Sequence, residues 1–307
     1  MKEWESIFWD GNPEKGMKGG KSGQFFTFKF NYNYDLGSRR CWIRPDFGVY
    51  KNFEEIKNML TIPTLEKMRE LKFHGMARAF EEQLGSSQYA ELGFEERLGF
   101  LIDRERTERE NRRLKARLTR ARIRQQACLE DIDYSAQRGL DKSLIQSLAT
   151  CQWIREHLNL LLDGPTGVGK SFIADAFANK VCREGFEVLC FRAPRLFEEL
   201  ALAHGDGRYP KLMNTIAKAH LIVIDDWGLS KIADSQQRDF LEILEDRHGI
   251  HSTLITSQIP SAQWHELMDN PTVADAIMDR LIHNAYKINL KGESMRKKKS
   301  QLTPAAR

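Results

Sequence analysis

The residues of this chain most capable of chemistry are eight consecutive ones, GPTGVGKS, at positions 164–171. They match the phosphate-loop pattern G-x-x-x-x-G-K-[ST] at every position. In such a loop, consecutive backbone N–H groups and the start of the following helix all point at a bound anion. We therefore predict an ATP site whose phosphate-binding residues are Gly164, Pro165, Thr166, Gly167, Val168, Gly169, Lys170 and Ser171.

Two side chains of this loop have distinct roles. Lys170 is expected to reach the β- and γ-phosphates, and the Ser171 hydroxyl is expected to hold Mg²⁺. An apolar run of strand length, 158–162, precedes the loop, and apolar residues at helical spacing follow it. A glycine-rich turn with a coincidental Lys-Ser pair is the alternative, but the strand and helix on either side favour a phosphate loop.

A second motif, LIVIDD at 221–226, consists of four apolar residues followed by two carboxylates. This pattern is typical of a buried parallel strand whose carboxyl end faces a ligand. Asp225 is predicted to hold Mg²⁺, and Asp226 is predicted to orient and deprotonate the attacking water. A strand that simply ends in a polar turn is the alternative, and the position of the motif after a phosphate loop argues against it.

Polar residues also end the strand STLITSQ at 252–258. If this strand lies beside the one that carries Asp225, its terminal hydroxyls and the Gln258 amide are level with the γ-phosphate, where they help to position water. The alternative is that these side chains cap the helix that begins near Ser261. Both roles stay open, because neighbouring residues can serve one each.

The elements that must position these residues alternate along the chain. Segments of helical periodicity separate apolar strands at 158–162, 188–191, 221–224, 252–258 and 285–290. Such alternation predicts an α/β domain, a parallel sheet flanked by helices, and we place it at 158–299. Its active residues are expected at the edge where the carboxyl ends of the strands meet.

The segment before this domain has a helical pattern. We expect residues 59–124 to form a small all-α N-terminal domain that binds DNA or a partner. Within it, residues 104–124 carry ten basic side chains and three acidic ones. Six arginines recur every three or four residues and so lie along one face of a helix: Arg106, Arg109, Arg113, Arg117, Arg120 and Arg124.

So many like charges on one face repel each other unless an acidic partner offsets them. The planar donor fork of arginine suits contacts with phosphates. We therefore predict that this face binds the backbone of double-stranded DNA without reading its bases. A solvated charged face is the alternative.

The remaining segments carry weaker signals. Residues 1–58 include a Phe-rich, strand-like stretch that is too small to form a stable core alone. We interpret them as an extension of unknown role, non-native or disordered, upstream of a natural start at Met59, with a small partner-binding β element as the alternative. Residues 125–157 are interpreted as a linker and residues 300–307 as a tail.

Composition excludes several classes of protein. The 307-residue chain is 41% hydrophobic and 29% charged, with a net charge of +4, which is ordinary for a globular protein. It has no run near the roughly 18 apolar residues that a membrane span requires. Its five cysteines are widely spaced, without a C-x-x-C pair. We therefore expect a cytoplasmic protein with neither a structural zinc site nor a membrane segment.

Together, the motifs resemble those of the IstB-like helper ATPases of insertion sequences, relatives of the DnaC helicase loaders and DnaA initiators among the AAA+ proteins. The resemblance covers residues 60–299. It rests on GPTGVGKS (164–171), LIVIDDWG (221–228), STLITSQIP (252–260), DAIMDRL (275–281) and LKGESMRKK (290–298). It implies the AAA+ form of the P-loop fold.

The resemblance also implies roles for single residues. Gln258 matches the sensor 1 position, and Arg280 matches the arginine finger that reaches the ATP of a neighbouring subunit. Arg247 is a second candidate for a role in the neighbouring site. Arg296 matches sensor 2.

The function that this resemblance implies is that of a Mg²⁺-dependent ATPase that assists transposition. Such a protein binds double-stranded target DNA as a homo-oligomer and works with a transposase. The runner-up is a helicase loader, which has the same ATPase but a helicase as its partner. A small-molecule kinase would leave the basic helix without a role, and a passive DNA-bending protein would not need Lys170 and Asp226.

Overall fold

The computed structural model describes residues 26–34, 41–49, 63–89, 91–135 and 138–295. They belong to two compact units, Met1–Glu108 and Arg109–Arg307. The division falls within one long helix, α3 (Phe94–Ala121), whereas the sequence analysis placed the domain boundary after residue 124. Each unit is described by itself.

The first unit contains a β-hairpin and a group of helices. Strand β1 (Phe26–Tyr34) pairs antiparallel with β2 (Cys41–Val49), the register joining Phe26 to Val49. Residues 63–70 are helical, followed by α2 (His74–Gly85), the short 3₁₀ helix η1 (Ser87–Tyr89) and the start of α3. The all-α module expected upstream of the ATPase is therefore present.

A buried carboxylate joins α2 to α3 within this unit. The Glu105 side chain accepts hydrogen bonds from the backbone N–H groups of Gly75 (2.8 Å) and Met76 (3.1 Å) at the start of α2. Those N–H groups have no partner inside their own helix, and a negative charge there is favoured by the helix dipole. A Cβ at Gly75 would lie 2.8 Å from the Arg104 carbonyl oxygen, so the close approach of the two helices requires glycine.

The second unit is built on a five-stranded parallel sheet in the order β4-β5-β6-β3-β7. Its strands are β3 (Asn159–Asp163), β4 (Val188–Arg192), β5 (Leu221–Trp227), β6 (Ser252–Ser257) and β7 (Ala285–Asn289). Its helices are η2 (Leu129–Asp131), α4 (Lys142–Leu148), α5 (Gln152–Arg155), α6 (Lys170–Arg183), α7 (Ala193–Asp206), α8 (Tyr209–Lys218), α9 (Asp234–Arg247), η3 (Ser261–Leu267) and α10 (Pro271–Ile282). The predicted P-loop AAA+ fold is confirmed.

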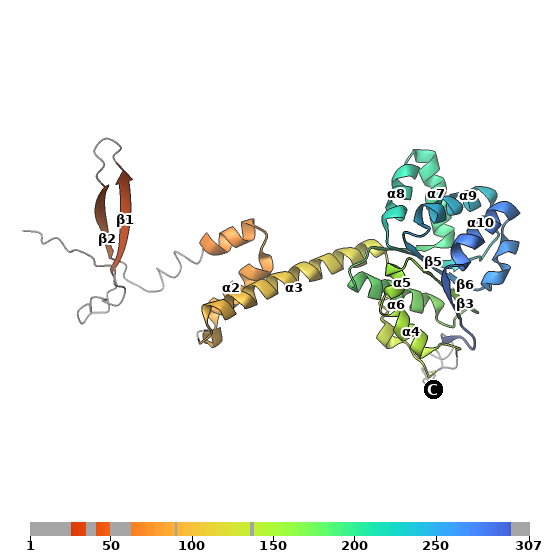
Figure 1. Cartoon of the computed structure of the whole chain (residues 1–307), viewed down its shortest axis with the longest axis horizontal. Helices are drawn as coiled ribbons and strands as arrows, with labels where there is room; N and C mark the ends of the chain where they lie inside the picture. The colour runs from red at the N-terminus through yellow and green to blue at the C-terminus, as the bar shows by residue number, and fades with distance from the viewer. Residues whose placement is uncertain (1–25, 35–40, 50–62, 90, 136–137, 296–307) are drawn as a thin grey trace, which may run out of the picture. The chain divides into compact units, whose positions relative to one another are not determined.

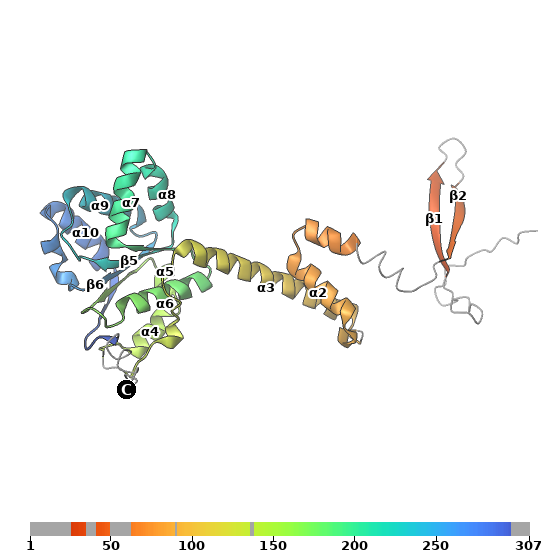
Figure 2. The ribbon, with the colours of Figure 1, turned by 180° about the vertical axis from the view of Figure 1, so that it is seen from behind.

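Each face of the sheet is covered by its own layer of helices. Along β3, Leu160 and Leu162 pack into one core with α6, whereas Leu161 packs into a second core with α7, α9 and α10. This alternation follows from the period of two in a β-strand. Figures 1 and 2 show α7–α10 on one side of the strands and α4–α6 on the other.

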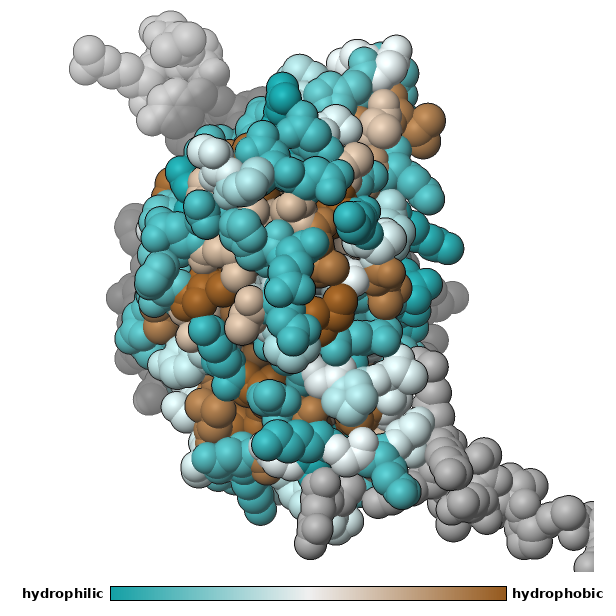
Figure 3. Space-filling model, turned by 90° about the vertical axis from the view of Figure 1, so that its right-hand side faces the viewer, coloured by the Kyte–Doolittle hydropathy of each residue, from teal (hydrophilic) through white to brown (hydrophobic). Residues whose placement is uncertain are grey.

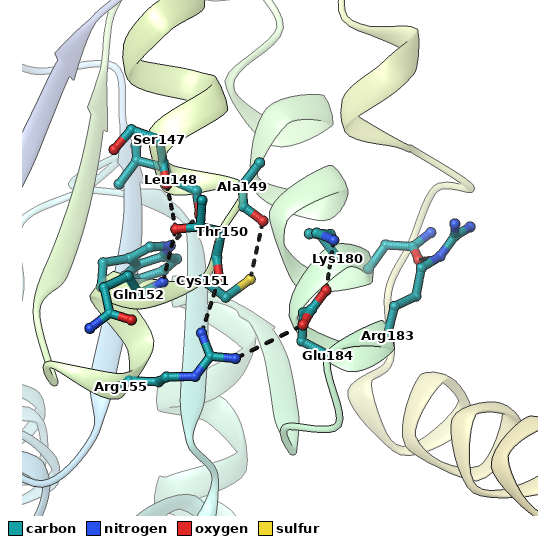
Figure 4. Close-up of polar contacts among 12 residues, drawn as sticks. Ser147, Leu148, Ala149, Thr150, Cys151, Gln152, Arg155, Lys180, Arg183 and Glu184 are labelled. Atoms are coloured by element: carbon teal, nitrogen blue, oxygen red, sulfur yellow. Dashed lines mark hydrogen bonds and ion pairs between the residues drawn. The ribbon is translucent and has the colours of Figure 1, made fainter.

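The segment 125–157, which the sequence analysis interpreted as a linker, is part of the first of these cores. Leu129, Ile145, Leu148 and Trp153 are buried there. Figure 4 shows how the segment is tied to the end of α6, where the Arg155 guanidinium lies 3.9 Å from the Glu184 carboxylate. Within the segment, Arg155 also donates to the Thr150 carbonyl oxygen at 3.0 Å. Its short helices interrupt the apolar pattern, which is why the sequence suggested a linker.

The surface of the second unit is mixed. The face presented in Figure 3 is mostly hydrophilic, with small apolar patches between charged side chains. None of the described helices combines the length and the apolar character needed to cross a bilayer.

Candidate functional site

The phosphate loop joins β3 to α6 as predicted. Two of its glycines leave room for a neighbouring segment that packs against the loop. Gly164 has a φ of +146°, and a Cβ there would lie 2.2 Å from the Leu290 carbonyl oxygen. Gly167 has a φ of +84°, and a Cβ there would lie 2.2 Å from the Ser294 hydroxyl. Residues with side chains are disfavoured at these positions by both backbone conformation and space.

The segment that packs on the loop is the LKGESM stretch after β7. Leu290 donates its backbone N–H to the Asp163 carbonyl (2.7 Å), and Met295 donates to the Gly167 carbonyl (2.9 Å). These bonds hold the phosphate loop from its outer side. Arg296, the sensor 2 candidate, lies outside the described residues.

Lys170 is buried at the first position of α6. Its ammonium group donates to the carbonyl oxygens of Gly164 (2.6 Å) and Pro165 (2.9 Å), so it reaches across the loop. Burial lowers the pKa of this ammonium group, and the Asp225 and Asp226 carboxylates oppose that effect. The side chain is therefore positioned to bind an anion in the loop.

Asp225 lies beside the start of α6, near the carboxyl end of strand β5. Its Oδ1 accepts hydrogen bonds from the hydroxyls of Ser171 (2.8 Å) and Thr256 (2.6 Å). The Ser171 hydroxyl and the Asp225 carboxylate thus offer adjacent oxygen ligands, which is the donor set that Mg²⁺ prefers. The opposite oxygen, Oδ2, accepts from the Arg124 guanidinium at 3.0 Å.

Asp226 follows Asp225 directly, yet it lines the same cavity as the phosphate loop. In a regular strand, consecutive side chains point to opposite faces. Here the pairing of β5 with β6 shifts between Ile224 and Trp227, and Asp226 has a φ of +63°. This irregularity redirects the side chain. Arg192 at the end of β4 donates to Asp226 Oδ2 through Nε (2.9 Å) and Nη2 (2.5 Å).

A cavity of about 240 Å³ opens over the phosphate loop. Seven predicted site residues line it: Thr166, Gly167, Gly169, Lys170, Ser171, Asp226 and Gln258. The lining also contains residues for which no role was predicted: Gln125, Asp131, Asp133, Arg138, Phe172 and Met295. The new members come from 125–138, from α6 (Phe172) and from the segment after β7. The sequence contained no signal for them, because they reach the cavity only through the fold.

Arg138 is the most buried of these newly identified residues, at 5% exposure. Its Nη1 donates to the Val168 carbonyl at 2.9 Å, and Nη2 donates to the Asp133 carbonyl. Its Nε is buried and has no hydrogen-bond partner among the residues that the structure describes. A buried arginine with a spare donor beside a phosphate loop fits a site for a nucleotide.

Gln258 and its neighbours differ in role. The Gln258 side chain lines the cavity, as predicted for a water-positioning residue. Ser257 instead serves the structure, because its hydroxyl donates to the Trp227 carbonyl (3.0 Å) and accepts from the Trp264 indole (3.2 Å). Among the polar residues at the end of β6, Thr256 is the one whose hydroxyl donates to Asp225, the predicted metal ligand.

The two candidates for an arginine finger are placed very differently. Arg247 is only 1% exposed and donates to the carbonyls of Ile216, Ala219 and Ser252. The interpretation of Arg247 as a residue that reaches a neighbouring subunit is therefore wrong, because its guanidinium is committed to the interior. Arg280, on α10, has a side chain that is 27% exposed and pairs with Glu245 at 2.9 Å.

The predicted basic stripe is divided by the structure. Helix α3 ends at Ala121, and Arg122 ends it with a left-handed φ of +56°. Arg124 lies beyond the helix and contacts Asp225, so its placement in a helical stripe is wrong. Arg117 donates to the Cys182 carbonyl (2.9 Å), and Arg120 pairs with Glu187 (3.1 Å).

The first three arginines of the stripe lie on the surface. Arg106, Arg109 and Arg113 are exposed along α3. The other three arginines of the stripe contact the rest of the second unit: Arg117 contacts α6, Arg120 contacts Glu187 before β4, and Arg124 contacts β5. The spacing rule correctly placed the helical residues on a helix, but it could not distinguish a face that meets solvent from one that meets protein.

Asp175, on α6, is a buried carboxyl that the sequence analysis did not single out. Its pKa is raised from 3.8 to about 6, first by burial and then by the Asp225 carboxylate. Arg124 and hydrogen bonds from Gln125 oppose the rise. The folded chain therefore binds this proton more tightly than the unfolded chain, and stability falls as the pH rises from about 4 to about 6.

Replacing Asp175 by Asn is expected to raise the melting temperature by a few degrees above pH 6 and to change it little near pH 4. The amide keeps the shape of the side chain without a charge to bury. Thermal melts from pH 4 to pH 8 measure the effect. Asp246→Asn, at an exposed position on α9, is the control and is expected to be neutral throughout. A uniform loss at every pH would contradict the explanation by charge burial.

This chain is similar to several known proteins. The family model for the IstB-like ATP binding protein matches residues 66–303. The insertion sequence ATP-binding protein y4pL of Sinorhizobium fredii is 49% identical over 239 residues, covering 78% of this chain and 98% of that protein. The ATP-binding protein of insertion sequence IS1162 from Pseudomonas fluorescens is 44% identical, covering 66% and 89%. The solved structure of DnaI aligns with 25% identity and a TM-score of 0.47, covering 54% of this chain and 91% of DnaI.

Proposed function

This chain belongs to the IstB-like ATP-binding protein family, and we propose that it is the helper ATPase of an insertion sequence, which assembles on target DNA and assists a transposase. Its relatives are described as ATP-binding proteins of insertion sequences. ATP binding and an AAA+ fold follow from membership of the family. DNA binding, assembly, the role of Mg²⁺ and the transposase are our proposals.

The observation that carries the proposal is the meeting of the two motifs. The Ser171 hydroxyl lies 2.8 Å from the Asp225 carboxylate, and Asp226 lines the same cavity as the loop. Phosphoryl transfer to water needs a phosphate cradle, metal ligands and a water-positioning group in one place. The phosphate loop, Ser171 and Asp226 line a single cavity, and Asp225 is hydrogen-bonded to the Ser171 hydroxyl beside it.

Each residue then has a role toward bound ATP. Lys170 neutralises phosphate charge, and Ser171 and Asp225 are the ligands for Mg²⁺, which would stabilise charge on the phosphates. Asp226 orients and deprotonates the attacking water, with Gln258 beside it. Arg124 and Arg192 are paired with the two carboxylates, so both arginines must withdraw before Asp225 and Asp226 can act.

The position of Arg280 supports hydrolysis within an oligomer. Its side chain is not among those that line the cavity over its own phosphate loop. It lies on α10, next to Asn159 and His248. An arginine that is absent from its own site and partly exposed is suited to complete the site of a neighbouring subunit.

The exposed arginines of α3 support contact with DNA. Arg106, Arg109 and Arg113 recur at helical spacing on a surface rich in positive charge. Guanidinium groups bind backbone phosphates without reading bases. A helper that must accept many target sequences needs this kind of contact.

The test of the proposal is the ATPase rate and particle size of the full chain with and without double-stranded DNA. We expect DNA and ATP together to increase particle size and to raise the rate at least about tenfold, because assembly would bring Arg280 to the neighbouring site. Multi-angle light scattering and phosphate release measure the two effects. A monomer whose hydrolysis ignores DNA would contradict the proposal and would favour a small-molecule kinase.

A further inference from the structure

We propose that Arg122, Arg124, Arg192 and Arg195 form a binding site for a phosphodiester group of double-stranded DNA, beside the nucleotide site, which becomes available when the nucleotide site is filled. The inference rests on the proposed DNA-binding function and assigns it to a second location in addition to α3. It makes the two carboxylates of the nucleotide site the switch for DNA affinity.

The site is a separate cavity of about 200 Å³ lined by these four arginines. Arg122 and Arg124 enter it from the chain just after α3. Arg192 ends β4, and Arg195 lies in the first turn of α7. The only acidic residue in its lining is Glu199, one turn after Arg195. Four guanidinium groups from three segments therefore converge on one hollow within the second unit.

In this structure three of the four arginines are neutralised. Arg122 pairs with Glu199 at 3.1 Å, Arg124 with Asp225 at 3.0 Å and Arg192 with Asp226 at 2.5 Å. Arg195 has no ion-pair partner among the described residues. The net charge around the cavity is consequently small, and an anion has little reason to bind.

Two of those carboxylates are the ones that the nucleotide site requires. When Asp225 serves Mg²⁺ and Asp226 serves water, neither can remain a full partner of Arg124 or Arg192. The cavity then presents four guanidinium groups against the single carboxylate of Glu199, and its charge becomes strongly positive. Filling the nucleotide site thus creates an anion site.

The coupling works in both directions. An anion bound by Arg124 and Arg192 draws them away from Asp225 and Asp226 and leaves those carboxylates free for metal and water. Linkage requires that DNA favour nucleotide binding by the same factor by which nucleotide favours DNA. An ATPase that hydrolyses ATP only when it is bound to DNA needs this reciprocal effect on the two affinities.

The chemistry of the cavity indicates a backbone phosphate. Arginine forks bind phosphate oxygens in pairs. The arginine side chains are accessible, with exposed fractions of 61% for Arg122, 47% for Arg124 and 42% for Arg192, so a long polymer can reach them. The ring of Phe191 in the lining is buried at 9% exposure and offers no platform for stacking a base.

The location also continues the surface of α3. From Arg113 to the helix end at Ala121 the rise is roughly 12 Å, which corresponds to about three to four phosphates along one DNA strand. A DNA backbone that contacts Arg113 therefore needs few further phosphates to reach Arg122. The cavity extends the basic surface toward the nucleotide site.

The experiment is a DNA-binding titration of the full chain at several salt concentrations, with and without Mg²⁺ and a non-hydrolysable ATP analogue. For the native protein we expect the nucleotide to raise DNA affinity at least about tenfold and to steepen the slope of log K against log salt by about one to two units. The double variant Arg122→Ala/Arg195→Ala should lose this increase. It should keep its affinity for the nucleotide and its particle size, which also verifies its folding.

Arg238→Ala removes an exposed arginine on α9 and is the matched control. It should keep the full increase. Asp225→Asn provides a second measurement, because it releases Arg124 without any nucleotide. This variant should bind DNA several-fold more tightly than the native protein when nucleotide is absent.

The outcomes separate the two proposals. If the native protein binds no DNA in any state, the proposed function fails, and this site fails with it. If it binds DNA and the double variant keeps the nucleotide-dependent increase, the site is wrong and the function stands. If the double variant loses nucleotide-dependent binding of inorganic phosphate but keeps the full increase in DNA affinity, the cavity belongs to free phosphate, and its assignment to DNA is overturned.

Discussion

Lys170→Ala is expected to weaken ATP binding by about 100-fold or more, whereas Asp226→Asn should retain binding and lose turnover by about 10²- to 10⁴-fold. Lys170 is buried and donates to two carbonyl oxygens of the phosphate loop, so its charge would face the phosphates of bound ATP. Asp226 lines the cavity, and because its proposed role is to activate water, its charge should matter mainly in the transition state. Equilibrium binding of a fluorescent ATP analogue and steady-state hydrolysis measure the two effects.

Matched controls distinguish chemistry from folding. Lys180→Ala removes a lysine from the same helix, where it pairs with Glu184 at the surface, and Asp234→Asn alters a carboxylate that pairs with Arg238. Both control variants should bind and hydrolyse ATP normally. Equal losses of binding in Lys170→Ala and Asp226→Asn would sink the division of roles. A large fall in melting temperature without nucleotide would identify either residue as structural.

Arg280→Ala should lower ATP turnover within the assembled protein by about 10³- to 10⁵-fold, the range reported for arginine fingers, with nucleotide binding retained. In the isolated chain, Arg280 pairs with Glu245 and donates to the Ala276 carbonyl, so removing it exposes no buried charge. The loss should appear in the hydrolysis rate at saturating ATP. Nucleotide affinity measured on the same preparation should match that of the native protein.

A mixing experiment tests whether Arg280 acts in the neighbouring site. Subunits with Arg280→Ala keep an intact Asp226, and subunits with Asp226→Asn keep an intact Arg280. When the two inactive variants assemble together, some interfaces combine both native residues, and hydrolysis should return. If activity stays absent in assemblies that demonstrably contain both variants, Arg280 does not act across the interface. The control variant Arg238→Ala changes an arginine on α9, and it should hydrolyse ATP normally without being mixed with another variant.

The local sequence pattern was sufficient to predict the strands and helices around the phosphate loop and the residues proposed for ATP hydrolysis. The strand before the phosphate loop, the helix after it and the buried strand ending in Asp225 were all found from apolar spacing and glycine positions. The helix after the loop ends at Arg183, two residues before Gly185, whose left-handed conformation does not continue a helix.

Local pattern was insufficient where a residue's role depends on distant neighbours. Residues 125–157 were interpreted as a linker, yet Leu129 and Trp153 are core residues and Arg138 lines the cavity. The arginine spacing after residue 104 predicted one stripe, but Arg117 and Arg124 contact the nucleotide unit instead. Periodicity specifies which side chains share a face and contains no information about what that face meets.

The sequence by itself determined the phosphate loop, the order of strands and helices and the identity of the two acidic residues, because each of these is set by neighbours a few positions apart. The sequence predicted roles for Asp225 and Asp226 in one site, but only the tertiary structure shows how two consecutive residues both come close to the phosphate loop. Consecutive strand residues ordinarily face opposite sides of a sheet. Here the shift in pairing between β5 and β6 and the left-handed backbone of Asp226 reverse that rule, and such a shift depends on hydrogen bonds to a strand that is distant in sequence.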